Sequence, residues 1–317
     1  MKTKIILYLL VVIFLNACGH HDLDIKKKKY LFIAKEREQS FHEVLMTGVK
    51  KEMVKLHVDV DFKAAKNQGD IGSQKEFLRQ AIATRKYDGI MLCPNDSKAL
   101  LEDIKKLNGA DIPYVIIDTA LENSTDTQDL KNDCGYVGTD NLEVGRMAMR
   151  FISDRVKGGR VLMVRGIHQH RSSIDRENGF LEEMNKLPSF RVIHFLQGEW
   201  KKKETYNAFL KFTKNSSENP DAIFAYNDYM ALGISQYYDQ NPKLKRPIIV
   251  GVDGTVVGQK GLLEGKIDAI VVQTAELMGI DGLRRIHECV SRSPIRKIQH
   301  FTPVTLLTST TALKRME

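Results

Sequence analysis

Short apolar runs alternate with amphipathic segments along most of the chain, and this alternation constrains the fold more than any other feature. The apolar runs predict strands in two sets, at 30–34, 58–62, 87–92 and 113–118 and then at 160–164, 191–196, 222–226 and 247–252. Between them, helical periodicity covers 41–56, 73–84, 96–107, 141–155, 174–186, 202–215 and 229–240. Strands that are apolar throughout indicate parallel sheets covered by helices on both faces. The two sets therefore predict an α/β protein of two Rossmann-like lobes.

The composition agrees with a globular protein of two lobes. The chain has 317 residues, of which 42% are hydrophobic and 28% charged, and this length can supply two separate cores. Its net charge of +8 is diffuse, and no helix-turn-helix or zinc-finger spacing accompanies it. We therefore expect no nucleic-acid partner.

The first 17 residues have the pattern of a secretory signal peptide. Lys2 and Lys4 precede eleven apolar residues, 5–15, and the small residue Ala17 follows. Eleven residues are fewer than the roughly 20 that a helix needs to cross a bilayer. An uncleaved anchor helix is the alternative interpretation of this segment.

Residues 15–18, with the sequence LNAC, resemble the lipobox of bacterial lipoproteins. The resemblance implies cleavage before Cys18, a lipid on that cysteine, and a mature protein anchored to a membrane in the periplasm or at the cell surface. Residues 18–29 are polar and contain four consecutive lysines, so we interpret them as a flexible, lipidated tether. Lysines beside an anionic membrane would each add about 1 kcal/mol of attraction.

The other cysteines and the histidines give no sign of a metal or a cofactor. Without Cys18, three cysteines remain, and an odd number leaves at least one free thiol in an oxidising compartment. They form no C-x-x-C pair, so we expect them to be buried and inert. His168 and His170 lack carboxylate or cysteine partners at a fixed spacing, which is weak support for a metal site.

Polar residues follow most of the expected strands. In parallel sheets, ligands bind outside the carboxyl ends of the strands, where helix amino ends also offer free N–H groups. The positions concerned are Lys35 and Glu36, 93–96, Asp118 and Thr119, Gly166, Asn227 and Asp228, and Asp253. Any single one of them would serve as a helix cap or turn residue. Their recurrence in both sets predicts a ligand site between the lobes.

Five segments carry a resemblance to a known family. They are YDGIMLCPNDS at 87–97, IPYVIID at 112–118, DRENGF at 175–180, AYNDYMALG at 225–233 and VGVDGTVVGQKGL at 250–262. In order and spacing they resemble the ribose- and galactose-type periplasmic sugar-binding proteins. These have the type I periplasmic binding protein fold, which is shared with the effector domains of LacI-type repressors.

The resemblance spans residues 30–307 and implies two lobes joined at a hinge by three crossovers. By position these lie near Thr139, Thr274 and Thr305, and the last strand includes 303–307. The amino-terminal lobe would comprise 30–139 and 274–305, and the carboxyl-terminal lobe 140–273 and 306–317. A ligand would be enclosed as the lobes close.

The resemblance also implies which side chains contact the ligand. These are Lys35, Gln39, Phe41, His42, Cys93 and Asp118 from the first lobe, Arg176, Trp200, Asn227 and Asp253 from the second, and Gln273 at the hinge. Carboxylates that accept hydrogen bonds from neighbouring hydroxyls, and an arginine that donates a fork of N–H groups, suit a polyol. The face of Trp200 would cover the C–H side of a sugar ring. Asn227 is the expected ligand contact, and Asp228 the expected cap of the following helix.

Four positions depart from the family pattern, so the resemblance does not identify the sugar. They are Lys35, His42, Cys93 and Thr119. Lys35 and Arg176 together would balance an anionic group, which leaves a sugar acid or sugar phosphate open beside a neutral sugar. Lys35 would equally pair with Glu36 or point to solvent.

The resemblance implies a monomeric receptor that binds a small sugar or polyol and performs no chemistry, most simply for an ABC importer's permease. A ligand-sensing subunit for a membrane histidine kinase or chemoreceptor is the alternative. A carbohydrate-acting enzyme with Asp118 and Asp253 as a glycosidase pair is a remote one. No G-x-S-x-G, P-loop or H-E-x-x-H motif is present, so we do not expect an enzyme.

The lipobox resemblance makes the first prediction. Cys18→Ser removes the acceptor of the lipid, so the protein should move from the membrane fraction to the soluble fraction when cells are fractionated. If the variant stays in the membrane fraction, residues 5–15 act as an uncleaved anchor instead.

Overall fold

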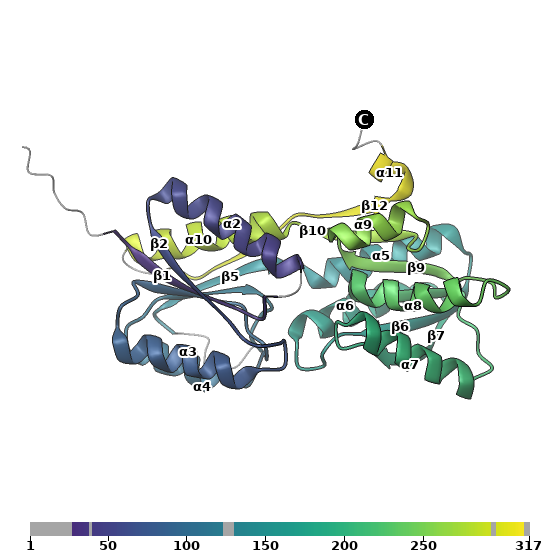
Figure 1. The fold of residues 1–317 in the computed structure, drawn as a ribbon, viewed down its shortest axis with the longest axis horizontal. Helices are drawn as coiled ribbons and strands as arrows, with labels where there is room; N and C mark the ends of the chain where they lie inside the picture. Colours follow the sequence, from purple (N-terminus) through teal and green to yellow (C-terminus); the bar gives the residue numbers. More distant parts are fainter. Residues whose placement is uncertain (1–26, 38–39, 123–129, 293–295, 314–317) are drawn as a thin grey trace, which may run out of the picture.

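The computed structural model describes residues 27–37, 40–122, 130–292 and 296–313. These form two α/β lobes that lie end to end along the long axis of the molecule (Figure 1), which confirms the expected fold class. The signal peptide, Cys18 and Gln39 lie outside the described residues. Within those residues, no helix has both the length and the apolar character that crossing a membrane requires.

The first lobe contains a six-stranded parallel sheet in the order β11-β5-β4-β3-β1-β2. Its strands are β1 (Lys29–Ala34), β2 (Asp59–Ala64), β3 (Gly89–Leu92), β4 (Tyr114–Asp118), β5 (Asp133–Thr139) and β11 (Ile298–Thr302). Its helices are α2 (Ser40–Leu56), α3 (Ile71–Thr84), α4 (Leu101–Gly109) and α10 (Ala275–Ser291). Helices α2 and α10 cover one face of the sheet and α3 and α4 the other, so each face has its own apolar core (Figure 1).

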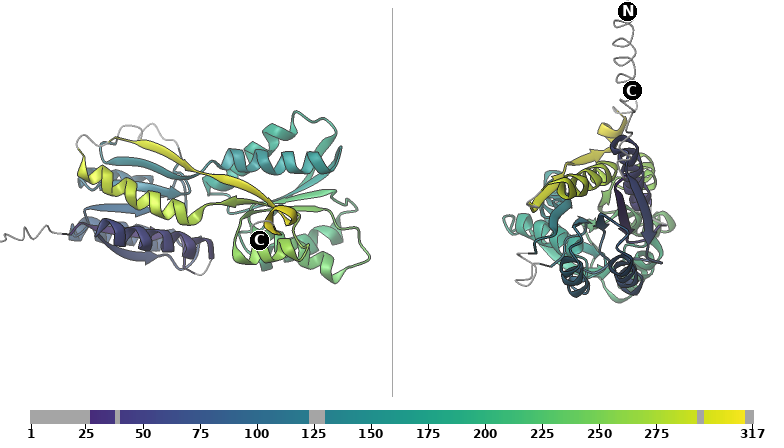
Figure 2. Two further views of the ribbon diagram at one scale, coloured as in Figure 1. Left: turned by 90° about the horizontal axis from the view of Figure 1, so that it is seen from above. Right: turned by 90° about the vertical axis from the view of Figure 1, so that its left-hand side faces the viewer.

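The second lobe repeats this arrangement in the order β12-β10-β9-β8-β6-β7, with only β12 antiparallel to its neighbour. Its strands are β6 (Gly159–Arg165), β7 (Phe190–Gln197), β8 (Ala222–Ala225), β9 (Ile248–Asp253), β10 (Ala269–Gln273) and β12 (Val304–Thr308). Its helices are α5 (Asn141–Arg155), α6 (Arg171–Met184), α7 (Lys202–Asn215), α8 (Asp228–Gln240), α9 (Val256–Leu263) and α11 (Ser309–Leu313). Figure 2 shows helices on both sides of this sheet as well.

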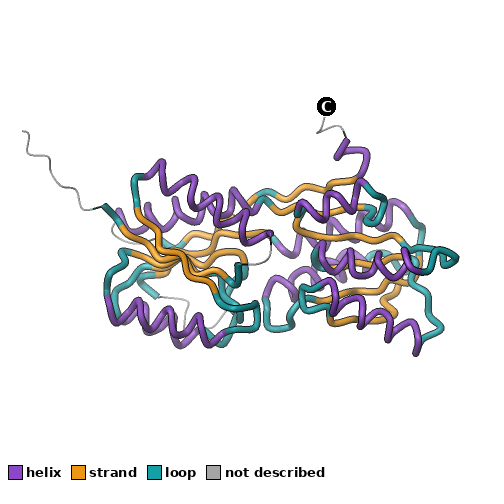
Figure 3. Tube along the Cα trace, viewed as in Figure 1, coloured by secondary structure: helices purple, strands orange, loops and turns teal. Residues whose placement is uncertain are grey.

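The chain passes between the two sheets three times. It does so after β5, which ends at Thr139, after β10, which ends at Gln273, and between β11 and β12 (Figure 3). The third change was expected near Thr305 and lies two residues earlier. Thr305 lies inside β12 opposite Val272 of β10, so the chain leaves the first sheet at Pro303.

Seven of the described elements were not expected from the apolar pattern alone: β5, α9, β10, α10, β11, β12 and α11. Helix α10 contains Gly279 and Gly282, which lower helix propensity in an isolated segment. A Cβ on Gly279 would collide with the backbone oxygen of Leu45 in α2, and a Cβ on Gly48 of α2 would collide with that of Glu276 in α10. Gly48 and Gly279 are needed because the two helices touch backbone to backbone.

The three described lysines of the amino-terminal run, at 27–29, belong to the folded lobe, so the tether interpretation is wrong for these residues. Lys27 pairs with Asp59, and Lys28 pairs with Asp88. Lys29 is the first residue of β1 and pairs with Asp61. These exposed pairs contribute little energy each, but the carboxylates offset the lysine charge at this end of the lobe.

A disulfide between Cys134 of β5 and Cys289 of α10 closes a loop with a sequence separation of 155 residues. Cys93 is the free cysteine among the described residues, and it is buried. The expectation of buried cysteines with at least one free thiol is confirmed, but two of them are cross-linked. The loop contains most of the second lobe, so the bond holds together the parts of the first lobe that precede and follow it.

Removing this bond should destabilise the protein. The double variant Cys134→Ala/Cys289→Ala should lose about 2–5 kcal/mol of unfolding free energy, because the unfolded chain is no longer closed into a long loop. Urea unfolding of the oxidised protein measures this, with thiol titration as the control. Equal stability, or free thiols at both positions in the wild-type protein, would contradict the assignment.

Candidate ligand-binding site between the lobes

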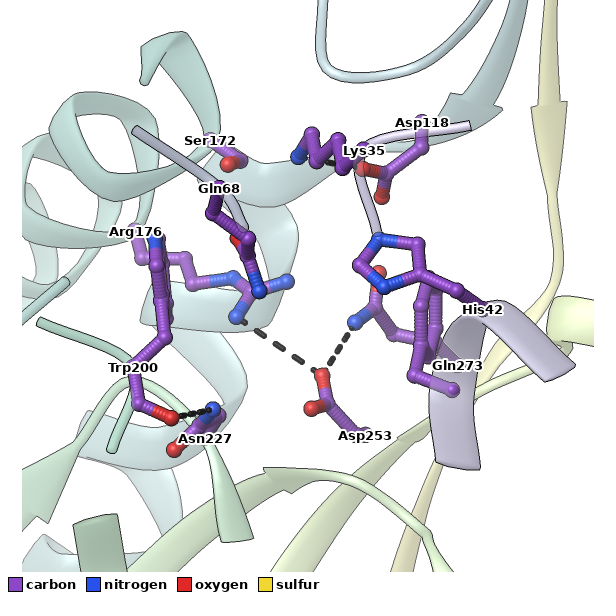
Figure 4. A pocket seen from close by; sticks show the side chains of 11 residues that line it. Lys35, His42, Gln68, Asp118, Ser172, Arg176, Trp200, Asn227, Asp253 and Gln273 are labelled. Carbon is purple, nitrogen blue, oxygen red and sulfur yellow. Dashed lines mark hydrogen bonds and ion pairs between the residues drawn. The ribbon is translucent and has the colours of Figure 1, made fainter. Parts of the chain in front are cut away.

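A small polar cavity lies where the carboxyl ends of the two sheets face each other (Figure 4). Its lining residues are Lys35, Phe41, His42, Gln68, Asp118, Ser172, Arg176, Trp200, Asn227, Asp253 and Gln273. The cavity volume is about 30 Å³. That is room for about two water molecules and far too little for a sugar ring, so a ring can enter only if the lobes move apart.

The first-lobe side of the cavity is dominated by a buried ion pair. Lys35 Nζ lies 2.6 Å from Asp118 Oδ2 and also donates to Thr119 Oγ1 at 2.6 Å. Burial opposes ionisation of Asp118, but the charge and the hydrogen bond of Lys35, with the charge of Arg176, outweigh it and lower the pKa of this carboxyl. Lys35 therefore does not pair with Glu36 or point to solvent.

The second-lobe side carries a second pair of opposite charges. Asp253 Oδ1 accepts a hydrogen bond from Gln273 Nε2 at 2.6 Å and lies 3.9 Å from Arg176 Nη1 (Figure 4). Arg176 also donates from Nε to Asn141 Oδ1 at 2.8 Å and from Nη1 to the backbone oxygen of Tyr226. Burial raises the pKa of Asp253 to about 7, although Arg176 and Gln273 act in the opposite direction.

Trp200 forms one wall of the cavity, and its indole packs against Gly166 after β6. A Cβ on Gly166 would collide with the six-membered ring of the indole. The Arg176 guanidinium lies 5.6 Å from the ring centroid. The backbone oxygen of Trp200 accepts from Asn227 Nδ2 at 3.1 Å.

Three lining residues have left-handed backbone conformations. The φ angles are 67° at Asp118, 62° at Trp200 and 108° at Asp253. Such conformations cost roughly 1–3 kcal/mol each in residues other than glycine, and they gather at ligand sites where side-chain direction matters. Each of the three residues ends or follows a strand and turns its side chain into the cavity.

Two buried polar atoms in the lining lack hydrogen-bond partners: His42 Nδ1 and Gln273 Oε1. Burial and the nearby Lys35 charge lower the pKa of His42 to about 4, so its ring is neutral. Neutral imidazole has one donor and one acceptor nitrogen, and the amide oxygen is an acceptor. Hydroxyl groups, which both donate and accept, would satisfy these atoms.

Ten of the eleven expected site residues lie in the described part of the chain, and nine of these line the cavity, Cys93 being the exception. Cys93 follows β3, and its side chain packs in the apolar core under α2 and α10. Burial raises the pKa of its thiol well above the ordinary value, so it is a poor nucleophile or ligand. The Cys93 expectation is therefore wrong.

Two lining residues were missed, Gln68 and Ser172. Gln68 lies in the loop after β2, whose residues were not among the strand-end positions expected to contact a ligand. It donates to Glu36 Oε1 at 2.6 Å. Ser172 lies in the first turn of α6, which begins at Arg171 and not at 174. Its hydroxyl lies 3.2 Å from Thr119 Oγ1 across the interface between the lobes.

The expected roles of Asn227 and Asp228 need a correction. Asn227 is the N-cap of α8, since its Oδ1 accepts from the backbone N–H of Met230 at 2.9 Å, and it also lines the cavity. Asp228 does not cap the helix. Its Oδ2 accepts from the backbone N–H groups of Gly254 and Thr255 and from the Thr255 hydroxyl, at 2.8–3.0 Å. It thus fixes the turn that follows Asp253.

Comparison with known proteins assigns the family. The model of the periplasmic binding protein domain matches residues 30–288. The chain belongs to the periplasmic binding protein family. It is 27% identical over 260 residues to the D-allose-binding periplasmic protein of Escherichia coli, covering 81% of this chain and 82% of that protein. It is 26% identical over 247 residues to the ribose import binding protein of Bacillus subtilis, covering 75% and 74%.

Solved structures of the family have the same two-lobed fold. A solute-binding protein of an ABC transporter from Actinobacillus succinogenes, with bound D-allose, superposes with a TM-score of 0.82 at 19% identity, over 91% of this chain and 100% of that one. One from Bacillus halodurans, with bound myo-inositol, gives a TM-score of 0.80 at 20% identity, over 92% and 98%. At these identities the likeness establishes the fold alone.

The raised pKa of Asp253 makes a pH prediction. The folded state holds the proton of Asp253 up to about pH 7, whereas the unfolded state loses it near the ordinary carboxyl pKa. The contribution of this proton to the free energy of unfolding is therefore complete below the ordinary carboxyl pKa and is lost as the pH rises to about 7. Asp253→Asn removes it. Without ligand, the melting temperature of the wild type relative to that of Asp253→Asn should therefore be higher at pH 5 than at pH 8. A difference between the two proteins that does not change with pH would contradict the raised pKa.

Proposed function

We propose that this chain is a lipid-anchored, extracytoplasmic solute-binding protein that encloses a neutral monosaccharide or polyol between its lobes for an ABC importer. The signal peptide and Cys18 would place it outside the cytoplasm and hold it on a membrane. The lining residues would serve as the ligand contacts. Binding without catalysis would be its whole role.

The balance of charge in the cavity carries this proposal. Lys35 already faces Asp118 at 2.6 Å, and Arg176 faces Asp253 at 3.9 Å. An anionic sugar would have to displace these carboxylates or accept their repulsion, which favours a neutral ligand. Donors and acceptors both surround the cavity, as neighbouring hydroxyl groups require.

The relatives support the same class of ligand. The names of the curated relatives specify D-allose, ribose or fructose. The solved structures carry D-allose, D-arabinose, myo-inositol or D-fucose. All of these are neutral and rich in hydroxyl groups, and they match the chemistry of the lining residues here.

The fluorescence of Trp200 offers a direct test, because it is the chain's single tryptophan and lines the cavity. The purified protein would be titrated with D-allose, D-ribose, D-arabinose, D-fucose and myo-inositol, and with D-galacturonate and ribose 5-phosphate as anionic counterparts. We expect at least one neutral ligand to change the emission and raise the melting temperature. A response to the anions alone would overturn the neutral assignment.

The central carboxylate gives a sharper prediction. Asp253→Ala should weaken binding of the responding sugar by about 2 kcal/mol or more, since a charge-assisted hydrogen bond is lost and Gln273 and Arg176 lose their partner. Asp59→Ala, an exposed carboxylate on the first lobe, is the matched control and should bind as wild type does. Equal affinities for all three proteins would mean that the sugar binds elsewhere.

A further inference from the structure

Residues 169–171 of the second lobe are bonded to the first lobe beside the cavity. The backbone N–H of Ser97, in the loop after β3, donates to the backbone oxygen of Gln169 at 3.1 Å. The backbone N–H of Arg171 donates to Ser97 Oγ at 2.9 Å. These two hydrogen bonds exist only while the lobes are closed, and we call them the Ser97 latch.

His170 is the residue between the two halves of this latch, and it is fully buried although it lies in a loop. Its Nδ1 accepts a hydrogen bond from Trp200 Nε1 at 3.0 Å. The two ring planes differ by 27°, with the centroids 5.9 Å apart. His170 therefore contacts the cavity wall on one side and the latch on the other.

The direction of this hydrogen bond determines the state of the imidazole. Indole N–H is a donor only, so Nδ1 of His170 must be the acceptor, and a neutral ring carries its proton on Nε2. Burial, with the charge of Lys35, lowers the pKa of His170 to about 3 and keeps the ring neutral. Asp118 acts in the opposite direction, as do backbone acceptors of Asn95 and Gln68.

His170 Nε2 has no completed hydrogen bond, although it is buried. The backbone groups that act on it, at Asn95 and Gln68, belong to the first lobe. A buried N–H without a partner is destabilising, so a small further closure that completes this bond would be favourable. The imidazole thus lies between Trp200, a ligand-facing side chain of its own lobe, and the main chain of the other lobe.

We propose that His170 is a positioning residue that couples the placement of Trp200 by a bound sugar to closure of the Ser97 latch. The proposal rests on the proposed function, because it assumes that a ligand packs against Trp200. A ligand that holds the indole in place also holds the imidazole through the Nδ1 hydrogen bond. The Nε2–H group then points at the first lobe, and the adjacent residues 169 and 171 engage Ser97.

Variants can separate the two halves of this coupling. His170→Asn keeps an acceptor near the position of Nδ1 but does not reach the first lobe. His170→Gln keeps a donor near the position of Nε2 but loses the acceptor for Trp200. His170→Phe removes both nitrogens and keeps a ring. His168→Phe, at an exposed position of the same loop, is the matched control.

Two readouts on the full-length mature protein test the proposal. Sugar affinity is measured by Trp200 fluorescence with the five neutral ligands named above. Closure is measured by hydrogen exchange at the backbone amides of Ser97 and Arg171, which are the donors of the latch. The exchange measurement is made with and without sugar, so it reports on the latch even if none of the five ligands binds.

We expect all three His170 variants to bind about tenfold or more weakly and to lose protection at Ser97 and Arg171, while His168→Phe matches wild type. Wild-type affinity in either His170→Asn or His170→Gln would overturn the coupling, because one of the two imidazole nitrogens would then be enough for tight binding. Unprotected latch amides in every state of the wild type would overturn it too. Failure of all five sugars with protection that depends on His170 would contradict the proposed ligand class but support the coupling.

Discussion

Charge buried between the lobes is the constraint on which the rest of the site depends. Lys35, Asp118, Arg176 and Asp253 are each less than 10% exposed. An isolated ion at such depth would cost several kcal/mol, so each must lie against an opposite charge. Each lobe meets this requirement by itself, because Lys35 and Asp118 both belong to the first lobe and Arg176 and Asp253 both belong to the second.

The pairing of charges within each lobe makes it easier for the lobes to separate. Since each buried cation has its carboxyl partner in its own lobe, separating the lobes leaves neither cation without that partner. The described contacts across the interface are neutral hydrogen bonds, such as Thr119 to Ser172 and Ser40 to Tyr229. Such bonds contribute about 1 kcal/mol each in net terms, so the two states can lie close in free energy. A ligand that contacts both lobes would then decide which state is populated.

Much of the fold could be predicted from the sequence because its strands are continuous apolar runs. The run at 160–164 lies within β6, and the helix expected at 202–215 is α7 with the same bounds. The pattern failed where packing replaced local preference. Helix α10 contains Gly279, which the close contact with α2 explains, and Gly282, which packs against Ile117 of β4, while β5 contains Gly135 and Gly138 among its seven residues.

The candidate site, like the fold, could be predicted only in part. Residues at strand ends, such as Asp118 and Asp253, follow from the rule that parallel sheets bind ligands at their carboxyl edges. The rule does not say toward which side a residue at such an end points, which is why Cys93 was misplaced and the helix cap was assigned to Asp228 instead of Asn227. Ser172 and His170 depend on contacts between the lobes, which no local pattern encodes.

The central claim is that a neutral sugar closes two separately balanced lobes around itself. Small-angle X-ray scattering tests it most directly, because opening of the lobes changes the radius of gyration. The cavity is too small for a sugar ring to enter while the lobes are closed, so the ligand-free protein must populate an open state. Saturation with a sugar that binds should therefore lower the radius of gyration. An unchanged radius on saturation would contradict closure as the mode of binding.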